Sequence, residues 1–122
     1  MLVRKENKII RKESMKSVKD IAEDMAFSLR DLGDVAFSFH NKDHFKYIIN
    51  CNGRELEVDI RKSGLSGRSI EVWNIVIYEN FEDGDYEELD RAESRIVLTG
   101  DYDEDISQVC SDAVSLVRDI IR

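Results

Sequence analysis

The sequence predicts an α+β domain with a five-stranded, mainly antiparallel sheet. Along the chain, one helix precedes the five strands and one helix follows them (order α-β-β-β-β-β-α). Apolar residues recur at helical spacing near both ends of the chain, and segments that alternate apolar with polar residues fill the middle. In the central hairpin, Asn52-Gly53 is a dipeptide that tolerates the two positive φ angles of a type I′ turn. The simplest architecture packs both helices on one face of the sheet.

Length and composition indicate one domain spanning residues 1–122, because the chain has 122 residues and is 42% apolar. Residues 1–13 mix basic and apolar side chains without a clear period, and we expect them to form a basic arm without the apolar block of a signal peptide. The longest strongly apolar run, 75–77, is too short to cross a membrane. Two isolated cysteines without CxxC spacing fit a reducing compartment, so we expect a cytoplasmic protein.

Charge is distributed unevenly along the chain. The net charge is −8, but residues 1–19 carry seven Lys/Arg and two Glu, a local charge of +5 that leaves −13 for the remainder. An acidic body of this kind repels nucleic acid and favours basic partners, although the same sign of charge also promotes solubility.

The first helix is predicted over 14–32, with Ser14 or Ser17 as N-cap and Gly33 as the stop. Its apolar residues recur every three or four positions, whereas Phe27 points away from that stripe. A strand over 34–40 follows, in which Val35, Phe37 and Phe39 are expected on one buried face.

The hairpin over 45–60 has a register fixed by its turn. The predicted partners are Cys51 with Arg54, Ile49 with Leu56, Tyr47 with Val58, Phe45 with Ile60, Lys46 with Asp59, and Ile48 with Glu57. One face of this hairpin is therefore expected to be dry and the other mostly wet.

The second half of the chain is predicted to contain two strands and a helix. A glycine-containing loop over 61–69 leads to a strand over 70–79, which is apolar on both faces. An acidic loop over 80–94 then precedes a fifth strand over 95–99 and an amphipathic helix over 103–122. We expect Trp73, Ile75 and Ile77 on the outer face of the fourth strand, and Phe27 and Trp73 are therefore candidates for self-association.

Two segments could bind ligands. The basic loop offers charges, hydroxyls and glycines for an anion, through Arg61, Lys62, Ser63, Ser66 and Arg68. The acidic segment combines carboxylates with aromatic side chains, as in a docking surface for a basic protein. Its candidate residues are Tyr78, Phe81, Glu82, Asp83, Asp85, Tyr86, Glu87, Glu88 and Asp90.

Catalytic chemistry has little support in the sequence. His40 and His44 lack a third local metal ligand, and no nucleophile or phosphate-binding motif is present. We therefore expect no enzyme, no metal and no cofactor. The leading hypothesis is a small acidic protein that inhibits or escorts a basic partner, as inhibitors, immunity factors and anti-defence proteins do. The alternatives are a module that binds an anionic nucleotide or signalling metabolite, and an oligomeric structural component.

Overall fold

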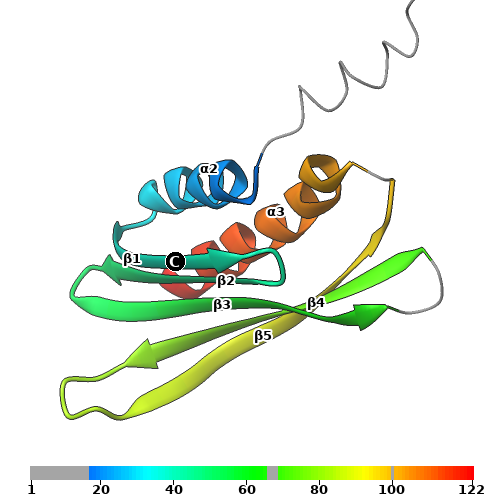
Figure 1. Cartoon of the computed structure of the whole chain (residues 1–122). Coiled ribbons are helices and arrows are strands. Elements are labelled where there is room, and N and C mark those ends of the chain that lie inside the picture. The colour runs from blue at the N-terminus through cyan, green and yellow to red at the C-terminus, as the bar shows by residue number, and fades with distance from the viewer. Residues whose placement is uncertain (1–16, 66–68, 100) are drawn as a thin grey trace, which may run out of the picture.

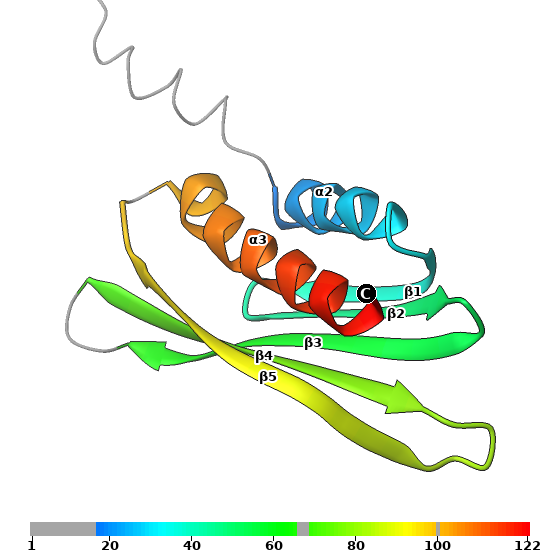
Figure 2. The same cartoon turned by 180° about the vertical axis from the view of Figure 1, so that it is seen from behind.

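The computed structural model describes residues 17–65, 69–99 and 101–122. Its elements are α2 (Val18–Arg30), β1 (Asp34–Asn41), β2 (His44–Cys51), β3 (Arg54–Leu65), β4 (Ile70–Asn80), β5 (Tyr86–Val97) and α3 (Tyr102–Ile121). The strands form one antiparallel sheet in the order β1-β2-β3-β4-β5. Both helices cover the same face of this twisted sheet (Figures 1 and 2), which confirms the predicted α+β class.

The β2–β3 hairpin has the predicted register at every position. Asn52 and Gly53 have φ angles of 51° and 82°, as a type I′ turn requires. Its paired apolar side chains, Phe45, Tyr47, Ile49, Leu56, Val58 and Ile60, are fully buried under the helices. This hairpin therefore supplies the centre of the core.

Helix α2 begins at a capping box. The Ser17 hydroxyl accepts a hydrogen bond from the backbone N–H of Asp20, and the Asp20 carboxylate accepts one from the N–H of Ser17. Ser17 is thus the cap, and Ser14 lies outside the described residues. The buried stripe is Ile21, Ala22, Met25, Ala26 and Leu29. As predicted, Phe27 points away from it and is 68% exposed.

The end of α2 packs closely against the end of β2. The N–H of Gly33 donates to the carbonyl of Leu29 over 3.2 Å. A Cβ added at Gly33 would lie 2.6 Å from both the carbonyl oxygen of Asn50 and the Cys51 sulfur. Gly33 is therefore needed for this close approach. The predicted role of Gly33 as the stop is not borne out in the form of a left-handed glycine cap, because the C-cap is Asp31 and the φ angle of Gly33 is not positive.

Helix α3 is attached to the sheet by both apolar and polar contacts. Ile106, Val109, Ala113 and Val117 are buried in the core. The carboxylate of Asp105 accepts hydrogen bonds from the N–H and the hydroxyl of Thr99, which ties the first turn of the helix to the end of β5. Within the described part of the chain, neither helix has the length and apolar content needed to cross a membrane.

The predicted faces of β1 are wrong beyond Val35. A bulge lies between Val35, which pairs with Ile49, and Phe37, which pairs with Ile48. Because side chains alternate along a strand, the extra residue moves Phe37 and Phe39 from the helix-covered face to the open face. They are 48% and 43% exposed, instead of buried.

The predicted outer face of β4 is also wrong. Trp73, Ile75 and Ile77 pair with Lys62, Ile60 and Val58, and all three are fully buried on the helix-covered face. The open face carries Val72, Val76 and Tyr78 instead. Alternation identifies the two sets of side chains in a strand, but only the partner strand decides which set faces the core. Trp73 is therefore a core residue in this chain.

Two predicted loops are largely strand. β3 continues through Arg61–Leu65 across a bulge between Lys62 and Gly64, and residues 66–68 lie outside the described part. β5 begins at Tyr86, so most of the predicted acidic loop pairs with β4. β5 is an edge strand, held by backbone hydrogen bonds to β4 on one side only, and much of it is exposed to water. Such a strand can form with few apolar residues, so the composition of this segment led us to predict a loop.

Replacing Ile49 with Ala should lower the free energy of unfolding by about 2–5 kcal/mol, because it leaves a cavity in the core. Ile48→Ala is the matched control, since the neighbouring isoleucine is on the open face and only partly buried. Denaturant unfolding of both variants measures the difference. Equal losses would contradict the assignment of the two faces.

Tyr47→Phe should change how stability depends on alkaline pH. The Tyr47 hydroxyl donates to the carbonyl of Ala22 over 2.7 Å, and burial, with a smaller contribution from Cys110, raises the pKa of Tyr47 above its ordinary value of 10.0. Above that value the unfolded chain loses a proton that the folded chain keeps, so stability falls by up to about 1.4 kcal/mol per pH unit.

Denaturant unfolding between about pH 9 and about pH 11 tests this effect. The variant should be less stable by about 0.5–1.5 kcal/mol at neutral pH, and its stability should fall less steeply in alkali. Parallel curves for the parent and the variant would show that Tyr47 does not titrate as a buried phenol.

Candidate partner-binding surface

The closed end of the β4–β5 hairpin carries the acidic and aromatic residues that the sequence singled out. It lies away from both helices in the two views (Figures 1 and 2). The turn is well defined: the N–H of Phe81 donates to the carbonyl of Asp85, and the N–H of Asp85 donates to the Asp83 carboxylate, each over 2.9 Å. Gly84, with φ at 90°, supplies the positive angle that the turn needs.

Three aromatic side chains gather at this end. Tyr78 and Tyr86 are in edge-to-face contact, with ring centroids 5.7 Å apart. Both project from the open face, because Tyr78 pairs with Glu88 and Tyr86 with Asn80 on neighbouring strands. Phe81, in the turn, is 44% exposed and Tyr86 is 69% exposed. The hairpin end therefore offers aromatic area that a partner can cover.

Some carboxylates of the hairpin have arginine partners. Arg54 donates to both oxygens of Glu79, at 2.9 and 3.3 Å, and Arg91 donates to both oxygens of Glu88, at 2.6 and 2.9 Å. These hydrogen bonds lower the pKa of Glu79 and of Glu88. Arg95 also lies 2.9 Å from Glu93.

The remaining carboxylates have no ion pair within the described residues. These are Glu82, Asp83, Asp85, Glu87 and Asp90. Glu82, Asp83 and Asp85 lie in the turn beside Phe81. Glu87 and Asp90 pair with Glu79 and Ile77, so they project from the face of the hairpin opposite to that of Tyr78 and Tyr86. Neighbouring side chains do not neutralise this negative charge. This combination of free charge and exposed aromatic area distinguishes the hairpin end from the rest of the sheet.

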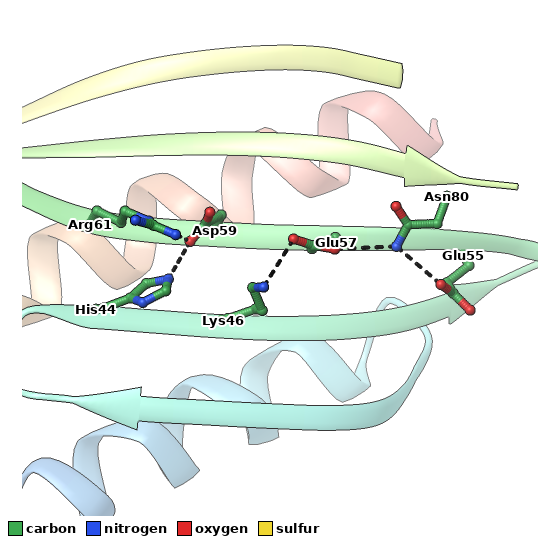
Figure 3. A network of polar contacts seen from close by, with 7 residues as sticks. All are labelled: His44, Lys46, Glu55, Glu57, Asp59, Arg61 and Asn80. Atoms are coloured by element: carbon green, nitrogen blue, oxygen red, sulfur yellow. Dashed lines mark hydrogen bonds and ion pairs between the residues drawn. The ribbon is translucent and has the colours of Figure 1, made fainter. Parts of the chain in front are cut away.

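The open face of β2 and β3 is different, because its charges neutralise one another (Figure 3). Asp59 contacts His44 and Arg61, and Lys46 Nζ lies 3.4 Å from Glu57 Oε2. The contacts of His44 with Asp59 and of Lys46 with Glu57 run diagonally across the ladder, since the direct partner of Lys46 is Asp59, as predicted. Arg61 and Asp59 lie on the same strand. The Asn80 amide then donates to Glu57 and to Glu55. This network leaves few polar groups for a partner.

A hollow of about 270 Å³ joins this network to the aromatic pair. Tyr78 and Tyr86 line one part of it, and Glu57 and Asp59 line another, together with Lys46, Arg61 and Asn80. Because Glu57 and Asp59 are already paired with Lys46, His44 and Arg61, what the hollow offers a partner is the two tyrosine faces, which suit the stem of a lysine or arginine side chain. The hollow therefore adds a receptive depression next to the acidic hairpin.

The predicted anion-binding residues are engaged with other groups. Lys62 Nζ lies 3.2 Å from Asp43 and 3.5 Å from Glu71, and the hydrogen bond with Asp43 is the main reason that its pKa is raised. Arg61 contacts Asp59, and the Ser63 hydroxyl donates to the carbonyl of Val72. Ser66 and Arg68 lie outside the described residues. The structure therefore does not bring the proposed set together as a free cluster of donors.

His40 and His44 face opposite sides of the sheet. His40 pairs with Phe45, on the helix-covered side, whereas His44 pairs with Arg61, on the open side, and contacts Asp59. No group of three metal-ligating side chains forms among the described residues.

Sequence reasoning missed the exposed pair Phe37 and Phe39. Their exposure depends on the β1 bulge, and the segment Val35-Ala36-Phe37 contains neither glycine nor another bulge signal. Only the pairing with β2 reveals it.

Comparison with protein-family models, with curated proteins and with solved structures finds no match to this chain in any of the three.

Proposed function

We propose that this chain is a non-catalytic binding protein that docks on a basic protein partner through the end of the β4–β5 hairpin. The observation that carries the proposal is that carboxylates without ion pairs among the described residues share one hairpin end with Tyr78, Phe81 and Tyr86. Inhibition or escort of the partner, as by an inhibitor, an immunity factor or an anti-defence protein, is the role that this surface suits.

Charge and aromatic area contribute to docking in different ways. Exposed carboxylates attract a basic partner over distances comparable to the Debye length, about 10 Å at 0.1 M ionic strength. Aromatic side chains bind once water is excluded, and residues of this kind dominate the energy of many interfaces. The hairpin should therefore steer association with its acids and hold the complex with its rings.

The proposed setting follows from charge and cysteine chemistry. A body of net charge −13 after residue 19 disfavours direct contact with nucleic acid. Neither Cys51 nor Cys110 is in a disulfide within the described residues, and a cytoplasmic location would keep both thiols reduced.

An anionic nucleotide or signalling metabolite remains the second candidate ligand. Arg61 supports it, because this side chain is 62% exposed and lines two adjoining hollows on the open face. The carboxylates beside Arg61 and Lys62 oppose it, so the acidic hairpin is the better supported site.

Affinity capture from the native host, followed by mass spectrometry, tests the leading proposal. The parent chain and a Phe81→Ala/Tyr86→Ala variant serve as matched baits. A basic protein retained by the parent and depleted with the variant is expected. Equal capture of the same proteins by both baits would place the interface elsewhere.

Neutralising the hairpin should slow association with the captured partner and reduce its salt dependence. The variant carries Glu82→Gln, Asp85→Asn, Glu87→Gln and Asp90→Asn. A control with equal net charge carries Glu23→Gln, Glu104→Gln and Asp119→Asn on the helices and Asp31→Asn at the C-cap of α2. Stopped-flow association at several salt concentrations measures both. The control should keep most of the parent rate, because steering depends on local charge. Equal slowing in both variants would show that only net charge matters.

Removing the aromatic anchors should have the opposite kinetic effect. Phe81→Ala and Tyr86→Ala should mainly speed dissociation, because most interface substitutions change that rate. Folding stability should change little, since both rings are exposed and neither belongs to the core. A slowed association with an unchanged dissociation rate would contradict an anchoring role.

Replacing Arg61, Lys62 and Arg68 with neutral residues tests the second candidate. If a phosphate-bearing ligand binds through these side chains, calorimetry should show its binding to the parent and its loss in the triple variant. Because Lys62 pairs with Asp43 and Glu71, thermal melting must first show that the variant folds. Binding that survives the triple substitution would remove this site from consideration.

A further inference from the structure

The two edges of the sheet have different chemistry. β5, at one edge, exposes mainly charged side chains, which discourage pairing with another strand. β1, at the other edge, has no charged residue between Asp34 and His40. An edge strand presents a row of unpaired backbone N–H and C=O groups, and an uncharged one is a template for a further strand.

Exposed aromatic side chains flank this uncharged edge on both sides. Phe37 and Phe39 project from β1 on the open face. On the helix-covered side, a groove of about 400 Å³ runs between α2 and β1, lined by Glu23 and Arg30 among others. Phe27 is a helical neighbour of both of these residues and is exposed beside the groove. Half of the six large apolar side chains that are exposed in the described residues thus lie at this one edge.

We propose that a second copy of this chain pairs with β1 in an antiparallel manner, about a two-fold axis at Ser38. The product is a dimer with one continuous ten-stranded sheet. In this register Phe37 of each copy lies opposite Phe39 of the other, which forms two aromatic cross-strand pairs on the open face. Axes at Phe37 or at Phe39 would form only one such pair, so the segment Phe37-Ser38-Phe39 favours the axis at Ser38.

Electrostatics permit this dimer in spite of the net charge of −8. The acidic hairpin belongs to β4 and β5, at the edge opposite β1. In a ten-stranded sheet the two β5 strands would be nine spacings apart, or about 43 Å at about 4.8 Å per spacing. That is several Debye lengths at about 0.1 M ionic strength, so the two acidic surfaces would repel each other weakly.

A second copy fits this edge better than a basic peptide does. The strand offers no carboxylate between Asp34 and Asn41 to recognise a basic segment, whereas its aromatic residues are complementary to themselves under two-fold symmetry. The basic partner of the proposed function is expected at the other edge, so the two proposals can fail independently.

Sedimentation equilibrium of the full chain tests the dimer directly. The parent should sediment at twice the mass of one chain, and Phe37→Lys/Phe39→Lys should halve that mass, because Lys on an edge strand opposes pairing. Phe81→Lys/Tyr86→Lys adds the same two charges at exposed aromatic positions of the β4–β5 hairpin, is the matched control, and should remain dimeric. A dimer that persists in the double variant overturns the proposal.

A cysteine at the axis provides a second test that does not depend on disrupting the strand. Directly opposed residues in antiparallel strands have Cα atoms about 4.5–5.5 Å apart, within the range of a disulfide. Ser38→Cys should therefore form a linked dimer under mild oxidation. Ala36→Cys should not, because its two copies would lie about 13 Å apart along the strands. Equal cross-linking of both variants, or of neither, overturns the proposed register.

Hydrogen exchange identifies what covers the edge if the parent is a monomer. The informative amides are those of β1 that point away from β2, since the others are already bonded in the β1–β2 ladder. Protection of the outward amides in a monomer would place another segment of the same chain, such as residues 1–16, on β1. Outward amides without protection would leave the edge uncovered. Either result overturns the proposal.

Discussion

The register of the β2–β3 hairpin is the constraint on which the rest of the structure depends. A slip of one residue would move Phe45, Tyr47 and Ile49 from the helix-covered face to the open face, together with their partners. Asn52 and Gly53, both with positive φ, close the hairpin at one position and exclude that slip. Since β4 pairs with β3, the same register brings Trp73 and its neighbours into the core beneath the helices.

Bulges then decide which aromatic side chains reach the surface. The bulge in β1 turns Phe37 and Phe39 outward. The one between β4 and β5 inserts Leu89, so that Tyr86 shares the open face with Arg91 and Tyr78. Without that extra residue, alternation from the inward-facing Ala92 would put Tyr86 on the opposite face of the sheet from Tyr78. Both proposed surfaces therefore depend on a single inserted residue in an edge strand, and the apolar area that they expose is built into the sheet.

Sequence signals within a few residues of each other predicted two parts of the fold correctly. The Asn52-Gly53 dipeptide predicted the β2–β3 hairpin with its full register, and the apolar stripe predicted α2 and the outward direction of Phe27. Three features depend on pairing between distant strands and could not be predicted from local sequence. They are the bulges, the burial of Trp73 on the helix-covered face of β4, and the full length of β5. The sequence identified the acidic and aromatic residues of the candidate surface, but it placed them in a loop, whereas those from Tyr86 onward lie on β5. The anion-binding hypothesis also treated 61–69 as a loop, whereas Gly64 pairs with Val72 and Lys62 binds two carboxylates.

The sheet order separates the two proposed surfaces and makes them compatible. β1 and β5 are opposite edges, so a second copy on β1 leaves the β4–β5 hairpin accessible. The proposed dimer would then present two acidic hairpins at the two ends of one sheet. A basic partner with two docking sites at a matching separation would bind both, and the second contact would form at a high effective concentration. Negative charge makes two copies of the chain repel each other. In the proposed dimer the acidic hairpins are far from the uncharged β1 segment that joins the copies, so they oppose the dimer weakly and stay available to attract a basic partner.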